Sequence, residues 1–207
     1  MSWINRILGG SSRAGLSEGP ASAHDGGHGA PDFMVIDVET SCSRRSSICQ
    51  VGIVGFTAGV VSFEYETLVD PCDEFHPVNV GIHGIDRHLV RGKPQFNSLH
   101  ATLTQHLGGR ITIAHSAFDR SALSAACALH SKPNIETRWL DSVKVARRAW
   151  PELDSHRLDA LASHLGLELK HHDALSDARA AGMVVVKAID HTGIELNEWF
   201  GELNQSA

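Results

Sequence analysis

The sequence predicts a single α/β domain, and three observations support this prediction. The chain has 207 residues, of which 42% are apolar and 20% are charged, so one domain can bury a substantial core. Three β-rich segments follow one another between residues 33 and 69. From residue 95 onward, short strand patterns alternate with longer segments whose apolar residues recur with helical spacing.

Residues 33–40, FMVIDVET, are expected to form a buried strand that ends in two acids. Apolar residues precede Asp37, and Glu39 follows two positions later, so a strand projects both carboxylates from one face. Neighbouring buried acids repel each other and are costly to ionise without a partner. The pattern therefore indicates a site for a hard cation such as Mg²⁺ or Mn²⁺, which prefers oxygen ligands. A strand end with solvated acids is the alternative.

The next two β-rich runs, residues 48–56 and 60–69, are expected to continue this strand as an antiparallel meander. A break separates them near Thr57–Gly59. The polar loop before the first run places Arg44 and Arg45 just beyond the acids. Their guanidinium groups either meet a phosphate backbone there or remain solvated.

Residues 70–94 are expected to be irregular, because three prolines interrupt them, and they contain the segment IHGI at residues 82–85. A helix is predicted over residues 95–107. Its apolar residues recur at intervals of three or four and are Phe96, Leu99, Leu103 and Leu107.

A strand at Ile111–Ala114 is expected to lead through a turn into a helix over residues 117–130. Asp119 then lies in the first turn of that helix, beyond the carboxyl end of a strand, where α/β folds tend to keep functional groups. An acid at this position is also a common capping partner for the helix N-terminus, so the residue has two interpretations when taken alone.

A short strand at residues 137–140 and a helix over residues 143–150 are predicted next. A second helix follows, with Ser155 as its N-terminal cap, apolar residues on one stripe as far as Leu165, and Gly166 as its C-terminal stop. We expect these features to serve core packing.

The stretch that contains His172 and Asp177 predicts a loop followed by a helix that runs to about Asp190. At 3.6 residues per turn, two residues five apart on one helix point in directions about 140° apart. Their cooperation is better explained if His172 lies in the loop and Asp177 lies in the first turns of the helix. A mobile histidine beside an anchored acid would suit a base, whereas a solvated basic loop is the alternative.

The charge balance argues against a protein that holds nucleic acid by a broad basic surface. The formal charge is −6 and the isoelectric point is near 6.1. The four cysteines have no spacing typical of zinc sites or of a disulfide framework, which favours a reducing compartment. No apolar run approaches the roughly 18 residues of a membrane span, and the N-terminus has no hydrophobic signal core. We therefore expect a soluble, cytoplasmic protein without a membrane partner.

Composition divides the chain into three parts. Residues 1–31 are dominated by Gly, Ser, Ala, Pro and His and are expected to be a flexible, disordered leader. Residues 32–190 carry every strand and helix predicted above. Residues 191–207 form a short acidic tail, in which Trp199 and Phe200 are expected to pack back onto the domain.

Four motifs of the chain resemble those of the DEDDh family of 3'–5' exonucleases, which includes the epsilon subunit of bacterial DNA polymerase III and RNase T. The first three are DVET with Asp37 and Glu39, AHSAFD with Asp119, and HDALSD with Asp177 and a preceding His172. IHGI is the fourth and supporting motif. The resemblance covers residues 32–189.

The resemblance implies a ribonuclease H-like fold with a central five-stranded mixed sheet, three antiparallel strands followed by two parallel ones, and helices on both faces. It implies that Asp37, Glu39 and Asp177 hold one divalent ion, Mg²⁺ or Mn²⁺, that Asp37 also reaches a second ion supported by Asp119, and that His172 takes a proton. Two such ions can serve both ends of a phosphodiester hydrolysis and offset phosphate charge locally. The expected product is a nucleoside 5'-monophosphate.

The resemblance also implies how a 3' end is held. Six residues are expected to bind substrate, and they are Thr40, His83, Gly84, Ile85, His115 and Phe118. In the family, an apolar side chain of the His-Gly-Ile segment packs against the last base, which tolerates any base. Single-stranded DNA or RNA 3' ends are thus the expected partners.

The motifs depart from the epsilon pattern in two places. AHSAFD is one residue shorter than the usual second motif, with Ser116 where asparagine is common, and DVET lacks the Thr-Gly that often follows it. A stable polymerase partner is therefore not supported, and a role in DNA repair or end trimming is expected instead. The alternatives are an exoribonuclease and, in another class, a catalytically idle nucleic-acid-binding domain. The sequence does not predict the oligomeric state.

Overall fold

The computed structural model describes residues 30–204 of the chain. Residues from Pro31 onward form one compact unit. The flexible leader predicted for residues 1–31 falls almost wholly within residues 1–29, which lie outside the described part.

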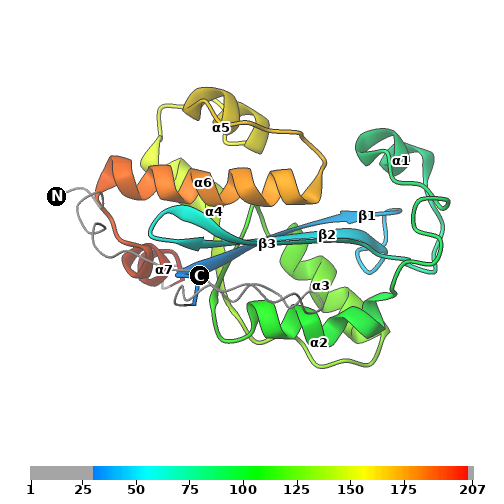
Figure 1. Cartoon of the computed structure of the whole chain (residues 1–207). Coiled ribbons are helices and arrows are strands. Elements are labelled where there is room, and N and C mark those ends of the chain that lie inside the picture. Colours follow the sequence, from blue (N-terminus) through cyan, green and yellow to red (C-terminus); the bar gives the residue numbers. More distant parts are fainter. Residues whose placement is uncertain (1–29, 205–207) are drawn as a thin grey trace, which may run out of the picture. The chain divides into compact units, whose positions relative to one another are not determined.

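A five-stranded mixed sheet forms the centre of this unit, as predicted (Figure 1). The spatial order is β3-β2-β1-β4-β5, with antiparallel pairing of β1 with β2 and of β2 with β3, and parallel pairing of β1 with β4 and of β4 with β5. The first strand is therefore central. The strands are β1 Phe33–Thr40, β2 Ile48–Thr57, β3 Val60–Leu68, β4 Ile111–Ala114 and β5 Arg138–Asp141.

Helices cover both faces of the sheet. Figure 1 shows α4, α5 and α6 on one face and α2 and α3 on the other. The helices are α1 Pro77–His83, α2 Phe96–Leu107, α3 Phe118–Leu129, α4 Ser142–Ala149, α5 Leu158–Leu165, α6 Ala174–Thr192 and α7 Leu196–Asn204.

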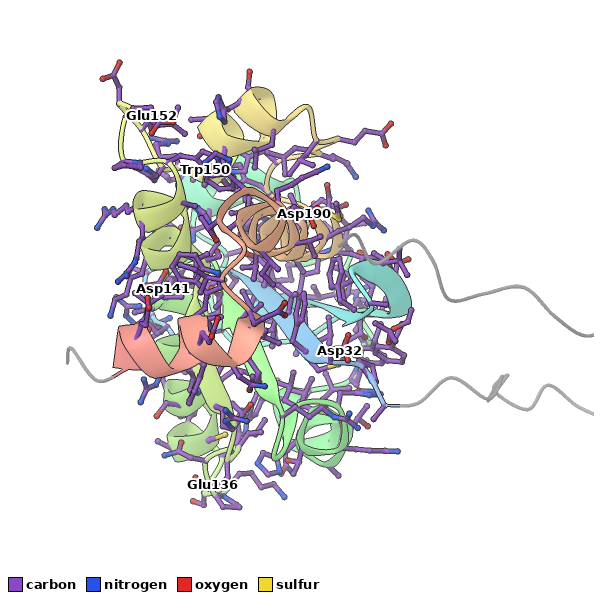
Figure 2. All side chains as sticks on the ribbon, turned by 90° about the vertical axis from the view of Figure 1, so that its left-hand side faces the viewer. Asp32, Glu136, Asp141, Trp150, Glu152 and Asp190 are labelled. Carbon is purple, nitrogen blue, oxygen red and sulfur yellow. The ribbon has the colours of Figure 1, made fainter. Side chains whose placement is uncertain are left out.

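The two-residue period of β1 separates two apolar cores. Phe33 and Val35 pack toward α4, α5 and α6, whereas Met34 and Ile36 pack toward α2 and α3. Figure 2, which views the sheet from its α7 end, shows side chains filling the space on both faces. The same period places the side chains of the following acids on the α6 face.

The N-terminus of α6 lies directly against β2 because Gly52 has no side chain. A Cβ atom at Gly52 would lie 2.4 Å from backbone atoms of Ala174 and Leu175. The buried Gln50 side chain ties the two elements together, since its Oε1 accepts from Ala174 N at 3.3 Å and its Nε2 donates to Glu66 Oε1 at 2.7 Å. The position of the first turn of α6 is therefore set by the sheet.

The rest of α6 is held against the sheet by a second close approach. A Cβ atom at Gly182 would lie 2.2 Å from the ring of Phe56 and 2.9 Å from Val35. Phe56 is fully buried and stacks on Phe33, with ring centroids 4.9 Å apart. Packing of this density keeps the long helix in register with β1 and β2.

The structure corrects two predictions. Residues 70–94 were expected to be irregular, but they contain α1, which begins at Pro77 and has no buried residue that would produce an apolar stripe. Ser155 does not cap α5, because the N-cap position belongs to Arg157. The Ser155 hydroxyl instead accepts from Arg157 N at 3.4 Å within the preceding turn.

The C-terminal residues form α7, and the prediction that its aromatic residues pack onto the domain is confirmed. Trp199 is fully buried in the core on the α6 face. Arg138 of β5 lies over the ring of Phe200, 4.3 Å from its centroid. Among residues 30–204, no helix combines the length and apolar character needed to cross a membrane.

Candidate active site

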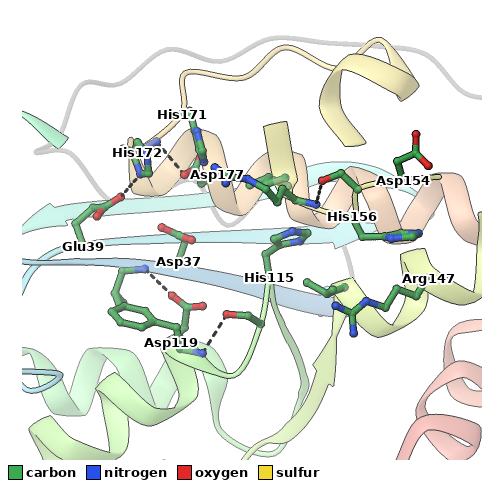
Figure 3. A pocket seen from close by; sticks show the side chains of 17 residues that line it. Asp37, Glu39, His115, Asp119, Arg147, Asp154, His156, His171, His172 and Asp177 are labelled. Atoms are coloured by element: carbon green, nitrogen blue, oxygen red, sulfur yellow. Dashed lines mark hydrogen bonds and ion pairs between the residues drawn. The ribbon is translucent and has the colours of Figure 1, made fainter. Parts of the chain in front are cut away.

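Three carboxylates converge where β1 passes the first turn of α6. Asp37 and Glu39 extend from one face of β1, and Asp177 extends toward them from α6 (Figure 3). One oxygen from each of the three lies within 4.8 Å of the others. The fold thus brings together the acids that the sequence assigned to one metal site.

Asp119 joins the cluster from the start of α3. β4 pairs with β1 only at Met34 and Val35, so the strand has separated from β1 by the time the chain reaches Val38. The Val38 N–H donates to Asp119 Oδ1 at 3.0 Å instead. Asp119 is buried, and its carboxylate is oriented by the backbone that carries Asp37.

Burial raises the pKa of all four carboxyl groups, and repulsion among these acids raises it further for Asp37, Glu39 and Asp119. The pKa of Asp37 lies well above its usual range because protein surrounds the group and because Asp119 and Asp177 repel its charge. Burial is also the main cause that raises the pKa of Glu39 to about 7, of Asp119 to about 7 and of Asp177 to about 6. The cluster therefore needs positive charge before all four groups ionise at neutral pH.

The donor set fits divalent cations that prefer oxygen ligands. Asp177 Oδ1 is buried and has no hydrogen-bond partner among residues 30–204, whereas Asp177 Oδ2 accepts from His172 N at 3.0 Å. A buried, unpaired carboxylate oxygen that faces two further carboxylates is suited to ligate a hard cation. The residues that could hold such ions are Asp37, Glu39, Asp119 and Asp177.

His172 lies in the turn before α6, as predicted, with a φ of 66°. Its Nδ1 lies 3.8 Å from Glu39 Oε1, and its ring stacks on that of His171 with centroids 3.9 Å apart. Burial, and then repulsion by His171, lowers the pKa of His172 below its usual value. The imidazole is thus neutral near pH 7 and can accept a proton at the edge of the carboxylate cluster.

Side-chain caps hold this turn on the helix. Asp173 is the N-cap of α6, and its Oδ1 accepts from Ser176 N at 3.1 Å. Ser176 Oγ in turn accepts from Lys170 N at 2.8 Å. These bonds lie on both sides of the histidine pair and set the path of the chain between α5 and α6.

The IHGI segment forms the C-terminal end of α1 and does not face the carboxylate cluster. His83 Nε2 lies 3.2 Å from the Thr40 carbonyl oxygen, and His83 Nδ1 accepts from Ile85 N at 3.0 Å. Gly84 ends α1 with a φ of 76°. The Ile85 side chain is only 5% exposed and packs in a small core, so it offers no surface to a base in this conformation.

A pocket of about 790 Å³ opens from the carboxylates. Two predicted substrate-binding residues, His115 and Phe118, line it, whereas Thr40 and residues 83–85 are absent from its lining. His115 Nδ1 lies 2.8 Å from Ser142 Oγ, and its Nε2 is buried without a hydrogen-bond partner in the described part of the chain. The pocket extends the site well beyond the acids.

One wall of the pocket comes from segments that the sequence analysis assigned to core packing. Arg147 of α4 and residues 154–158 before α5 line this wall. Sequence reasoning missed them because only the fold brings them beside β1. The sequence offered one signal, the adjacent arginines at positions 147 and 148. Adjacent residues on a helix point in different directions, so one of the two could face a site while the other faces elsewhere.

The two arginines that follow β1 lie in different surroundings. Arg44 Nε donates to Asp73 Oδ2 at 2.8 Å, and Arg44 also pairs with Glu74, so its charge is already matched. Arg45 donates to Ser121 Oγ and lies over the Phe118 ring, 5.2 Å from its centroid. Of these two arginines, only Arg45 makes no ion pair with residues 30–204, and the Phe118 ring beneath it lines the pocket.

Comparison with known proteins finds relatives that match most of this chain. A family model described as Exonuclease, of the RNase T type, matches residues 34–185. The PolC-type DNA polymerase III of Oceanobacillus iheyensis is 28% identical over 183 residues, which cover 83% of this chain and 13% of that protein. The corresponding protein of Thermotoga maritima is 28% identical over 170 residues, covering 80% and 12%. The chain thus spans about an eighth of the length of these relatives.

Solved structures confirm the predicted fold. Exonuclease X in complex with 5' overhanging duplex DNA superposes with a TM-score of 0.65 at 22% identity, covering 82% of this chain and 98% of that one. E. coli Exonuclease I in complex with a dA16 oligonucleotide superposes with a TM-score of 0.67 at 19% identity, covering 83% of this chain and 42% of that one. The nuclease domain of 3'hExo, described as a DEDDh family member bound to rAMP, superposes with a TM-score of 0.66 at 14% identity, covering 77% of this chain and 92% of that one. The shared architecture is the ribonuclease H-like sheet with helices on both faces.

Proposed function

The chain belongs to the DEDDh family of 3'–5' exonucleases, and from this premise we propose that it is a metal-dependent enzyme that releases nucleoside 5'-monophosphates from single-stranded 3' ends. The observation that carries the proposal is the convergence of Asp37, Glu39 and Asp177 with their oxygens within 4.8 Å of one another. Asp119 lies beside them, hydrogen-bonded to the same strand.

The four acids are proposed to bind and orient the catalytic ions. Two divalent ions, Mg²⁺ or Mn²⁺, would supply Lewis acidity at the attacking and leaving oxygens of the phosphodiester. Asp37, Glu39 and Asp177 would hold one ion, and Asp37 with Asp119 would hold the other. Because α6 packs closely against β2 at Gly52 and β2 is paired with β1, we expect the carboxylates on β1 and α6 to keep their positions when substrate binds.

His172 is proposed to accept the proton of the attacking water at its imidazole. Its lowered pKa keeps the ring neutral at physiological pH, and its Nδ1 lies 3.8 Å from Glu39 Oε1 at the edge of the cluster. The ring is 40% exposed, which leaves it free to pass the proton to solvent after each turnover.

DNA is the proposed substrate, with RNA as the alternative. Structures with this fold hold a dA16 oligonucleotide and an overhanging duplex DNA, but another holds rAMP. Nothing in the carboxylate cluster distinguishes the sugars, because the ions act on phosphate oxygens. A catalytically idle binding domain is disfavoured because all four acids and the histidine converge at one site.

We propose a role in repair or end trimming rather than as a stable partner of a polymerase. The PolC-type relatives match this chain over only about an eighth of their length, so a polymerase activity is no part of the proposal. All four cysteines are free, which is consistent with the reducing cytoplasm expected from the sequence.

The test is a time course on 5'-labelled single-stranded DNA and RNA of one sequence, with Mg²⁺, with Mn²⁺ and with chelator. We expect a ladder that shortens one nucleotide at a time from the 3' end, only when a metal is present, and faster on DNA. A faster RNA ladder would select the exoribonuclease alternative. No ladder with either metal would contradict the enzyme and favour the idle binding domain.

A further inference from the structure

The pocket beyond the carboxylates carries positive charge that the proposed reaction has not used. Arg147 and Arg157 both line it, and Asp154 is the one acidic residue in that part of the lining. Arg147 makes no ion pair with any of residues 30–204. Arg157 makes one in that range, with the exposed Asp159 at 3.4 Å. Both guanidinium groups therefore remain available to an anion.

Arg147 and the segment that precedes Arg157 lie to one side of the acids. In Figure 3, Asp37, Glu39 and Asp119 lie on one side of His115, and Arg147, His156 and Asp154 lie on the other. His115 Nε2, buried and unpaired among the described residues, is a further polar atom on the pocket lining. A substrate that leaves the acids in this direction meets cations.

The helix at the C-terminal end of β1, α1, carries no lysine or arginine. α1 is tied to β1 immediately after Glu39, because Asn79 Nδ2 donates to the Thr40 carbonyl oxygen at 2.9 Å. Two large apolar side chains of α1 are exposed, Val78 at 62% and Ile82 at 49%. The two sides of the carboxylate cluster thus differ in charge.

A nucleic acid 3' end has the same asymmetry about its last phosphodiester. The terminal nucleoside on the 3' side carries no further phosphate, whereas the strand on the 5' side carries one phosphate for each nucleotide. Arginine binds phosphate by charge-assisted, often bidentate hydrogen bonds, and apolar side chains accept any base or sugar face. If the phosphates of the 5' side meet the arginines and the terminal nucleoside lies toward α1, the strand has one direction across the site.

We propose that Arg147 and Arg157 bind the phosphate one nucleotide 5' of the scissile one, so that the upstream strand lies along the α4 side and the terminal nucleoside lies toward α1. This inference rests on the proposed exonuclease function and assigns its substrate polarity. It makes a 5'-phosphorylated dinucleotide the shortest substrate that uses the whole site.

Arg45 is the competing candidate for this phosphate. It lies over the Phe118 ring, which lines the pocket, and has no ion pair within the described residues. If Arg45 held the upstream phosphate, the strand would leave the acids past α3 instead of past α4. The test therefore includes a variant of each.

The experiment compares kcat/KM on the dinucleotides pTpT and TpT, which share one scissile bond and differ only in the upstream phosphate. We expect the wild-type protein to prefer pTpT by about tenfold, the effect of a charged hydrogen bond. The Arg147→Gln/Arg157→Gln double variant should lower that preference to less than about twofold. Both side chains are surface groups, so an unchanged melting temperature verifies the fold.

The Arg148→Gln/Arg91→Gln double variant is the control for charge. It removes two positive charges as well, but Arg148 turns away from the pocket to Glu202, at 3.0 Å, and Arg91 is absent from the pocket lining. We expect this variant to keep the full preference for pTpT. The proposal is overturned if the Arg147→Gln/Arg157→Gln variant also keeps it, or if Arg45→Gln alone removes it. Failure of the wild-type protein to cleave either dinucleotide or longer strands would instead overturn the exonuclease function on which the inference rests.

Discussion

At the scale of single residues, the site consists of four acids whose charged forms are disfavoured by their surroundings in the fold. Asp37, Glu39, Asp119 and Asp177 all have raised pKa values, first because of burial, and their acidic neighbours raise the values further. Sequence spacing could predict these positions, because a two-residue period fixes a strand face and a helix start fixes the direction of an acid.

The sequence could not predict which residues form the rest of the pocket. Ile85, expected beside the last base, is buried, because the short helix before it returns the chain to the body at that point. Arg147 and His156 reach the pocket through tertiary packing, for which no local pattern exists. Motifs therefore located the acids and the histidine, and the fold was needed for the wall that surrounds them.

A substitution of His172 tests its role as the base. We expect His172→Ala to lower kcat by about 10²-fold or more, the usual contribution of a general base, while leaving the melting-temperature shift caused by Mg²⁺ unchanged. The stacked neighbour supplies a matched control, since His171→Ala should lose less than about tenfold. A severe loss in His171→Ala with a mild loss in His172→Ala would show that His171, and not His172, is the base.

At the scale of elements, periodicity predicted every strand and all helices except the first and the last. β1 and α6, which carry three of the acids, have long apolar patterns that tertiary contacts reinforce. α1 escaped prediction because it is seven residues long and exposes its apolar residues. α7 was expected only as a tail that packs back, although its Trp199 completes the core on the α6 face.

The contact between β2 and α6 links packing to catalysis. Gly52→Ala would place a methyl group 2.4 Å from backbone atoms of Ala174 and Leu175, and backbone cannot rotate away as a side chain can. α6 must then shift, and Asp177 and His172 must shift with it. We expect a loss of about 1–3 kcal/mol in the free energy of unfolding and a loss of activity at temperatures where the variant remains folded.

Gly201→Ala is the matched control for this substitution. A Cβ at Gly201 of α7 meets no atom within 4 Å, so the change should leave activity intact and raise helix propensity by about 1 kcal/mol. Chemical denaturation and the ladder assay measure the two effects. An active, fully stable Gly52→Ala variant would show that the helix position is not set by this glycine.

At the scale of the whole molecule, a chain of net charge −6 is proposed to act on a polyanion. The acids concentrate negative charge at one point, where bound divalent ions would reverse it, and the arginines along the pocket add local positive charge. Substrate affinity should therefore come from this site rather than from long-range attraction.

The raised pKa values also predict how stability depends on pH without metal. Glu39, Asp119 and Asp177 bind protons more tightly in the folded protein, so their favourable contribution is complete below about pH 4 and is lost as pH rises through about 6 to 7. His172 and His115 contribute to stability in the opposite sense. Their pKa values are lowered in the folded protein, so their favourable contribution is present at higher pH and is lost as pH falls. A metal-dependent difference at each pH separates the acids from the histidines.

The most direct test of the metal centre is the melting temperature from pH 5 to pH 8 with and without Mg²⁺ or Mn²⁺. We predict a small metal-induced rise at pH 5, where protons compete, and a rise of about 5–10 °C at pH 8 when the ion is at 100 times its Kd. Asp177→Asn should abolish the rise, and Asp190→Asn, a control from the last turns of the same helix, should retain it. A rise that is absent at every pH, or equal in both variants, would contradict the claim that these buried acids form a divalent metal site.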